Sequence, residues 1–178
     1  MDKKAKIELL RANLAEYPDF PKKGILFWDI FSILKEPELF HVLKDVLMET
    51  VKEIQPLPEC IVALDARGFL FGPILSLELN IPFVPVRKPG KLPGELITST
   101  YTKEYGEDSL ALQLNSITNG QRVLIIDDLL ATGGTLACAV EMVQKAGGNV
   151  IACLALIELE ALNGRKLINK DIISLIKI

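Results

Sequence analysis

The fold is decided by the stretch Val123-Leu-Ile-Ile-Asp-Asp-Leu-Leu-Ala-Thr-Gly-Gly-Thr135. Its first four residues are branched and apolar, which predicts a strand buried on both faces of a sheet. Two adjacent acids, Asp127 and Asp128, come next, and we expect the strand to end there. Small and glycine residues then lead into an apolar helical pattern. The stretch therefore predicts a strand, a short loop and a helix.

The loop in this stretch has the character of an anion-binding site. Backbone N–H groups at a helix N-terminus have no intrahelical partner, and the helix dipole favours negative charge there. The two acids repel a phosphate but suit the hydroxyl groups of a ribose, so the stretch predicts a site for a ribose 5-phosphate. An ordinary strand-to-helix turn gives no reason for two adjacent carboxylates. The residues expected to bind the 5-phosphate are Ala131, Thr132, Gly133, Gly134 and Thr135.

Two other phosphate-binding motifs do not occur in the sequence. No Gly-x-x-x-x-Gly-Lys-Ser/Thr segment is present, which excludes the P-loop of nucleotide triphosphatases. No Gly-x-Gly-x-x-Gly segment follows a predicted strand, so dinucleotide binding lacks its fingerprint.

Apolar runs and helical patterns alternate along the rest of the chain. This alternation predicts an α/β fold, a parallel twisted sheet flanked by helices. Residues 22–34 are expected to be irregular. Predicted strands cover residues 60–64, 82–86, 122–126 and 150–159, and predicted helices cover residues 4–16, 37–54, 69–79 and 135–146.

Ligands of parallel sheets bind at the carboxyl ends of the strands. Four segments follow predicted strands and should meet at that edge: residues 65–68, Arg87-Lys88, residues 127–135 and Glu158-Leu159. Residues 88–120 lie between the two strand–helix–strand units and predict a flexible β-hairpin arm. The arm has glycines at its base and a polar, aromatic tip, which favours a lid over a plain surface hairpin.

Composition bounds the remaining possibilities. The 178 residues suit one domain, and a hydrophobic content of 49% with a mean hydropathy of +0.31 suits a sheet covered on both faces. No apolar run approaches the roughly 20 residues of a membrane helix, and no signal peptide is predicted. Three scattered cysteines suit a reducing, cytoplasmic compartment. A net charge of −3 without a basic cluster gives no support for nucleic-acid binding.

The stretch 123–135 resembles the phosphoribosyl-pyrophosphate signature of type I phosphoribosyltransferases. Other segments narrow the resemblance to the adenine-specific members of that family, and they follow the family's order over nearly the whole chain. The matching segments are residues 17–21, 24–27, 65–72, 87–88, 90–94, 101, 104–106 and 158–159.

This resemblance implies the type I phosphoribosyltransferase fold in a single domain, 1–178, with a base-binding hood to which residues 1–34 contribute. It implies transfer of the 5-phosphoribosyl group from phosphoribosyl pyrophosphate to adenine, which yields AMP and pyrophosphate in purine salvage. Mg²⁺ would arrive mainly bound to phosphoribosyl pyrophosphate, with no dedicated metal ligands on the protein. A homodimer is also implied.

The resemblance assigns roles to particular residues. Asp127 and Asp128 would accept from the ribose hydroxyls, and Glu104 would exchange a proton with N7 of adenine, helped by Tyr105 and Arg67. An unusual peptide is expected at Ala66–Arg67. The expected adenine-binding residues are Leu26, Phe27, Trp28 and Leu159, and the expected pyrophosphate-binding residues are Ala66, Arg67, Arg87, Lys88 and Lys91.

Two alternatives and two departures remain at this point. Transfer to hypoxanthine, guanine or xanthine would call for a lysine near Glu158-Leu159, and a sugar-phosphate-sensing regulator would call for a basic face. Trp28 stands where many relatives have arginine, and Pro89 interrupts a basic stretch where relatives often have another arginine.

Overall fold

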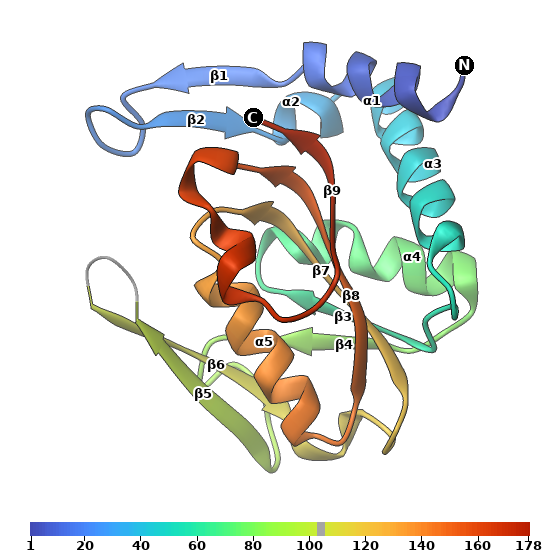
Figure 1. Ribbon diagram of the computed structural model, residues 1–178, viewed down its shortest axis with the longest axis vertical. Coiled ribbons are helices and arrows are strands. Elements are labelled where there is room, and N and C mark those ends of the chain that lie inside the picture. The colour runs from blue at the N-terminus through green and yellow to red at the C-terminus, as the bar shows by residue number, and fades with distance from the viewer. Residues whose placement is uncertain (103–105) are drawn as a thin grey trace. The chain divides into compact units, whose positions relative to one another are not determined.

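The computed structural model describes residues 1–102 and 106–178 (Figure 1). The chain divides into two compact units, Met1–Lys52 and Glu53–Ile178. Each unit is described by itself below. The predicted hood, residues 1–34, lies within the first unit, and the assignment of residues 1–178 to one domain stays a prediction.

The first unit joins helices to a two-stranded antiparallel ribbon. Its elements are α1 Lys3–Ala12, β1 Ala15–Pro18, β2 Leu26–Asp29, α2 Phe31–Leu34 and α3 Pro37–Glu53, the last crossing the boundary by one residue. The long helix α3 confirms its prediction. Two other predictions were wrong: the first helix ends at Ala12, four residues early, and residues 22–34 contain a strand and a helical turn.

Long-range hydrogen bonds explain the early end of α1. The Asn13 side chain donates to the Leu9 carbonyl at 2.9 Å, which caps the last turn. The Ser32 hydroxyl donates to the Asn13 carbonyl at 2.8 Å and accepts from the Ala15 N–H at 3.0 Å. Ser32, 19 positions after Asn13, therefore fixes the backbone of residues 13–15 outside the helix that the sequence pattern predicted.

The second unit is built on a five-stranded, all-parallel sheet with the strand order β4-β3-β7-β8-β9. The parallel sheet confirms the predicted fold class. The elements are β3 Cys60–Leu64, the 3₁₀ turn Arg67–Leu70, α4 Gly72–Leu79, β4 Phe83–Val86, β5 Leu96–Thr102, β6 Glu107–Gln113, β7 Arg122–Leu130, α5 Gly134–Lys145, β8 Asn149–Glu158 and β9 Ile172–Lys177, with further 3₁₀ turns at Leu114–Ser116, Glu160–Leu162 and Gly164–Leu167.

The edge strand β9 was not predicted from the sequence. Parallel neighbours usually need a helical crossover, and no helical pattern separates β8 from β9. The chain instead returns through the two short 3₁₀ turns at Glu160–Leu162 and Gly164–Leu167. Because no helical pattern follows β8, the sequence contains no sign of a further strand–helix–strand unit, and β9 was not predicted.

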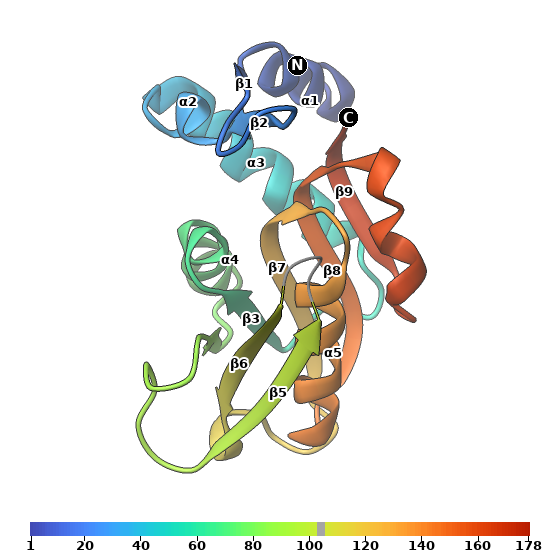
Figure 2. The same cartoon turned by 90° about the vertical axis from the view of Figure 1, so that its left-hand side faces the viewer.

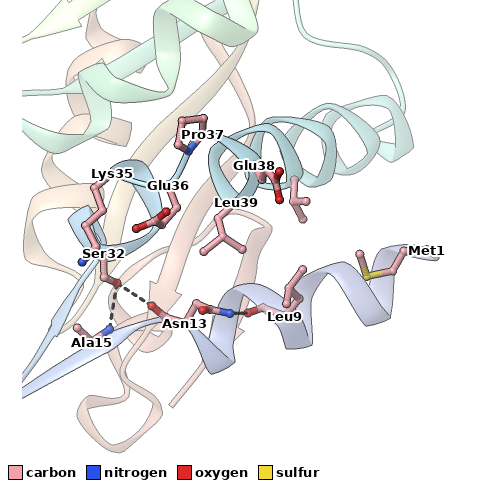
Figure 3. A pocket seen from close by; sticks show the side chains of 11 residues that line it. Met1, Leu9, Asn13, Ala15, Ser32, Lys35, Glu36, Pro37, Glu38 and Leu39 are labelled. Atoms are coloured by element: carbon pink, nitrogen blue, oxygen red, sulfur yellow. Dashed lines mark hydrogen bonds between the residues drawn. The ribbon is translucent and has the colours of Figure 1, made fainter.

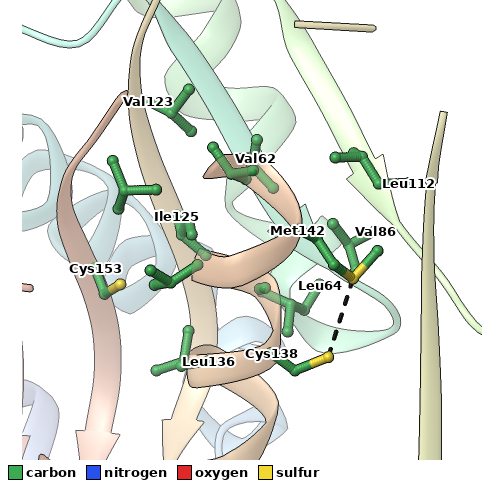
Figure 4. Close-up of a cluster of buried hydrophobic side chains, with 14 of the residues drawn as sticks. Val62, Leu64, Val86, Leu112, Val123, Ile125, Leu136, Cys138, Met142 and Cys153 are labelled. Carbon is green, nitrogen blue, oxygen red and sulfur yellow. Dashed lines mark hydrogen bonds between the residues drawn. The ribbon is translucent and has the colours of Figure 1, made fainter. Parts of the chain in front are cut away.

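Strand alternation sends helices to opposite faces of the sheet. Val62 and Leu64 of β3 share one core with Leu136, Val143 and other residues of α5 (Figure 4). On the other face, a methyl group added at Gly72 of α4 would lie 2.7 Å from the Ala63 side chain, so α4 packs there. All four residues from Val123 to Ile126 are fully buried, as predicted for a doubly covered strand.

The predicted hairpin arm is confirmed as the separate antiparallel pair β5–β6. It packs against α5, as Figures 1 and 2 both show. The Ser99 hydroxyl bonds the Glu141 carboxylate of α5 at 3.3 Å, and Leu110 and Leu112 enter the core shared with α5. The body of the arm is thus anchored, while its role as a lid stays a prediction.

The three cysteines are buried and free, and they pack as small core residues. Burial raises the pKa of Cys60 to about 11 and that of Cys153 to about 12, so neither forms a thiolate near neutral pH. Among the described residues, no helix combines the length and the apolar character needed to cross a membrane.

Candidate active site

The carboxyl ends of β3, β4, β7 and β8 meet at one edge of the parallel sheet, as predicted. The loop after β3 touches the end of β7, since a methyl group at Gly68 would lie 2.8 Å from the Ile126 carbonyl oxygen. The end of β8 is tied to β7 because the Leu159 N–H donates to the Leu130 carbonyl at 2.9 Å. The segments predicted to converge therefore do so within the second unit.

The two acids lie inside β7, not at its end. Pairing with β8 continues through Asp127, Leu129 and Leu130, so the expectation that the strand ends at the acids was wrong. The reason is that β8 is long enough to extend the ladder beyond the apolar run. Asp128 is only 7% exposed, and its carboxylate lies close enough to that of Asp127 for each to affect the pKa of the other.

Burial raises the pKa of both acids. The pKa of Asp127 lies well above its usual range because of desolvation first and the neighbouring Asp128 charge second. Desolvation also raises the pKa of Asp128, and the Arg67 guanidinium partly offsets that rise. Arg67 Nε lies 2.7 Å from Asp128 Oδ2. Hydrogen-bond donors from a ligand would therefore stabilise the charged form of both carboxyl groups, which burial disfavours.

The loop 131–135 presents a helix N-terminus next to these acids. Gly133 is the N-terminal cap of α5 with φ +88°, a conformation that L side chains rarely adopt. Thr132 is exposed, whereas Thr135 donates its hydroxyl hydrogen to the Tyr101 hydroxyl at 3.1 Å. Thr135 therefore also connects the loop to the arm. The loop's assignment to a 5-phosphate stays a prediction.

Two of the residues predicted to bind pyrophosphate, Arg87 and Lys88, form ion pairs with nearby carboxylates. Arg87 Nε lies 2.8 Å from Asp65 Oδ2, and its Nη1 donates to the Lys91 carbonyl at 3.2 Å. Lys88 Nζ lies 3.4 Å from Asp108 Oδ2 on the arm. Arg87 thus links the loop after β3 to the start of the arm. Sequence reasoning gave Asp65 no role, although its acidic side chain beside Arg67 was a usable signal.

The unusual peptide of this loop is one bond earlier than expected. The Asp65–Ala66 bond is cis, and the expectation for Ala66–Arg67 was wrong. The peptide lies directly after β3, and its carboxyl-terminal neighbours form the 3₁₀ turn Arg67–Leu70.

The predicted adenine residues belong to both units. In the first unit, Leu26, Phe27 and Trp28 form three of the four residues of β2, and the Phe27 ring meets the Phe20 ring edge to face at 5.1 Å. In the second unit, Leu159 directly follows β8 and is half-buried. The predicted catalytic residues Glu104 and Tyr105 lie outside the described residues.

A cavity of about 960 Å³ lies in the first unit among α1, α2 and α3 (Figure 3). Apolar side chains of Leu9, Leu39 and Val42 line it together with polar groups such as Ser32 and Glu36. It contains none of the predicted site residues. Within residues 1–102 and 106–178, no group of three or more His, Cys, Asp or Glu side chains is placed to hold a metal ion.

Residues 30–178 match the phosphoribosyl transferase domain family. This match covers all of the second unit and includes every described residue of the sheet edge discussed above. It defines the class of protein to which the fold and the site belong.

Curated and solved relatives narrow that class. The chain is 51% identical over 168 residues to adenine phosphoribosyltransferase of Thermosipho africanus, which covers 94% of this chain and 98% of the relative. The crystal structure of the enzyme from Thermoanaerobacter pseudethanolicus has a TM-score of 0.92 at 46% identity, covering 97% of this chain and 99% of that one. The Saccharomyces cerevisiae enzyme, solved with adenine and an imino-altritol bisphosphate, has a TM-score of 0.89 at 43% identity, covering 96% and 98%. The chain therefore belongs to the adenine phosphoribosyltransferase family.

Proposed function

We propose that this enzyme transfers the 5-phosphoribosyl group from phosphoribosyl pyrophosphate to adenine, which yields AMP and pyrophosphate in purine salvage. The family supports the reaction. The observation that carries the site assignment is the meeting of two acids, an arginine and a helix N-terminus at one sheet edge, formed by Asp127, Asp128, Arg67 and the loop 131–135.

The loop 131–135 is proposed to hold the 5-phosphate. Its backbone N–H groups at the start of α5 donate, and each charge-assisted hydrogen bond contributes about 1.5–3 kcal/mol. Thr132 and Thr135 add hydroxyl donors. Asp127 and Asp128 accept from the ribose hydroxyl groups, which supplies the donors that their buried carboxylates favour.

The pyrophosphate is proposed to bind the loop after β3. Arg67 pairs with Asp128 in the described structure. When the substrate binds, the pyrophosphate would contact Arg67 and the ribose hydroxyls would contact Asp128. The Ala66 backbone, Arg87, Lys88 and Lys91 complete the predicted cationic surface. Both Arg87 and Lys88 have carboxylate partners that an incoming anion would compete with.

Phe27 and Leu159 are each proposed as adenine-binding residues, with backbone groups from Leu26 to Trp28 at the Watson–Crick edge of the base. The pairing of β2 with β1 supports this role, because a strand in a two-stranded ribbon can offer its second edge to a ligand. The N9 lone pair of adenine attacks C1 of the ribose, and the bond from C1 to the pyrophosphate oxygen breaks. Glu104 takes the N7 proton, and Tyr105 assists from the arm.

Mg²⁺ is proposed to arrive with phosphoribosyl pyrophosphate. The donor chemistry fits, since Asp127 and Asp128 offer the hard oxygen ligands that Mg²⁺ takes, while the described residues form no three-ligand cluster. Most ligands would therefore come from phosphoribosyl pyrophosphate and water. When bound, Mg²⁺ neutralises charge on the pyrophosphate.

Three further expectations belong to this proposal. The lid function of residues 88–120 would exclude water from the activated sugar. A homodimer and a cytoplasmic location follow from the family resemblance and the sequence. Sedimentation equilibrium tests the dimer directly, with a mass of about twice the 19.7 kDa chain expected.

An assay of each purine base with phosphoribosyl pyrophosphate and Mg²⁺ tests the function. We expect AMP from adenine, with hypoxanthine, guanine and xanthine poor by comparison, since no lysine lies at Glu158-Leu159. A preferred oxo-purine would overturn the base assignment. Binding of phosphoribosyl pyrophosphate with no transfer to any base would instead favour a sugar-phosphate sensor.

Glu104→Gln tests the proposed proton transfer. We expect turnover with adenine to fall by roughly 10²-fold, the usual scale of general acid–base catalysis. Affinity for phosphoribosyl pyrophosphate should change little. Near-normal turnover, measured where chemistry limits the rate, would remove Glu104 from the mechanism.

A further inference from the structure

The proposed 5-phosphate loop is backed by a second glycine, Gly164, from the segment after β8. A methyl group at Gly133 would lie 2.2 Å from the Gly164 carbonyl oxygen, and one at Gly164 would lie 2.3 Å from the Ala131 carbonyl oxygen. Two backbones therefore touch without side chains between them. Gly164 is buried and does not have a positive φ, so close approach alone requires a glycine there.

The next residue, Arg165, anchors this contact to the sheet. Its guanidinium forms a two-pronged ion pair with Glu158, with Nε at 2.5 Å from Oε1 and Nη2 at 2.6 Å from Oε2. Nη1 donates to the Ile172 carbonyl at 2.7 Å, and Nη2 donates to the Ser174 hydroxyl, which in turn donates to Glu158. The anchor thus spans the end of β8 and the edge strand β9.

The anchor is suited to a fixed geometry. Glu158 is 4% exposed, and hydrogen bonding to Arg165 lowers its pKa, so the pair stays charged near neutral pH. Planar, two-pronged pairs fix orientation as well as distance. Because Gly164 directly precedes Arg165, the position of the guanidinium determines where the Gly164 backbone meets the loop.

We infer that Gly164, held by the Arg165–Glu158 pair, is a positioning element that sets the conformation of the loop 131–135 for the 5-phosphate. This inference rests on the proposed function of that loop. Neither residue needs to touch the substrate. Both act through the backbone of Ala131 and Gly133, and they should therefore control affinity for the phosphate group while leaving recognition of the nucleoside unchanged.

Calorimetric titration with AMP and with adenosine tests the inference, because the two ligands differ only in the 5-phosphate. For Gly164→Ala we expect AMP affinity to fall at least about tenfold while adenosine affinity stays within about twofold. Equal losses for both ligands, or an unchanged ratio in the folded variant, would overturn it.

Gly148→Ala is the matched control. Gly148 also lacks a positive φ and is also crowded, with a methyl group there 2.8 Å from a Val143 side-chain carbon, but it lies beyond the other end of α5. We expect it to reduce thermal stability without changing the ratio of AMP to adenosine affinity. A change in that ratio equal to the change for Gly164→Ala would show that crowding anywhere near α5 suffices, and would overturn the inference.

Arg165→Lys keeps the test decisive if Gly164→Ala does not fold. Lysine retains the charge but loses the two-pronged geometry, so AMP affinity should fall by roughly three- to tenfold with adenosine affinity unchanged. An unaltered ratio would exclude the anchor. The wild-type protein separates the two proposals: if it binds AMP no better than adenosine, the 5-phosphate assignment of the loop itself fails.

Discussion

The loops after β3 and β7 follow neighbouring parallel strands, yet they are held in different ways. The loop after β3 packs on the β7 backbone at Gly68, but its charged side chains are held by ion pairs, Arg67 with Asp128 and Asp65 with Arg87. Backbone packing holds the loop after β7, where Gly133 meets Gly164. An incoming anion can replace an ion pair but not a packed backbone. The first loop is therefore built for exchange with a ligand, and the second for a constant geometry.

The largest effect is expected from Gly133→Ala, which disrupts the backbone contact of the loop after β7. The substitution combines a φ of +88° with a contact of 2.2 Å to the Gly164 carbonyl oxygen. The strained backbone alone costs about 1–3 kcal/mol, and we expect AMP affinity to fall by roughly 100-fold. Calorimetry with AMP measures the loss.

Gly120→Ala is the control for that variant. Gly120 has a similar φ of +78°, but a methyl group there meets no atom within 4 Å. It should reduce stability and leave AMP affinity normal. If Gly133→Ala does no more than this control, the packed contact has no role in phosphate binding.

The next effect is expected from Arg67→Gln, which attacks the loop held by ion pairs. The loss of a charged hydrogen bond of about 1.5–3 kcal/mol should weaken pyrophosphate and phosphoribosyl pyrophosphate by roughly 10–100-fold. AMP has no pyrophosphate, so its affinity should change by less than about threefold. Equal weakening of AMP and pyrophosphate would mean that the two loops do not divide the substrate as proposed.

Asp127→Asn should weaken AMP binding by roughly tenfold, because a neutral amide accepts less strongly from the ribose than a carboxylate. Calorimetric titration with AMP measures the loss.

The same substitution should increase the free energy of unfolding near neutral pH. The folded pKa of Asp127 is raised above its ordinary 3.8, so the folded protein binds more protons than the unfolded chain. This group's contribution to stability is therefore present below pH 3.8 and is lost as pH rises through the folded pKa.

Urea unfolding of both proteins at several pH values checks the sign. Asp127→Asn should gain in free energy of unfolding relative to wild type as pH rises from about 4 towards neutrality. A gap that narrows over this range would contradict the raised pKa.

The smallest effect is expected from Trp28→Arg, which lies in neither loop. Trp28 follows Phe27 in β2, and the proposed recognition of adenine uses the backbone there. We expect kcat/KM with adenine to change by less than about tenfold, or about 1.4 kcal/mol. A switch of the preferred base would show instead that this side chain recognises the purine.

Local pattern was sufficient for the strands of the sheet that carry buried apolar runs. Residues 60–64 form β3 as predicted, and the parallel order brought the predicted loops to one edge. It failed for β2 and β9. Their segments are short and do not alternate between apolar and polar residues, and their strand form depends on partners elsewhere in the chain, β1 and β8.

The sequence by itself determined the α/β class, the two acids beside a glycine loop, and through these the family. Those features are local, because burial pattern, charge and backbone freedom are properties of neighbouring residues. Only the tertiary structure decided that Asp128 holds Arg67, that Arg87 holds Asp65, and that Gly164 backs Gly133. Such contacts join segments that are 22 to 61 residues apart, and composition or spacing cannot specify which distant groups the packed sheet edge brings within a few ångströms.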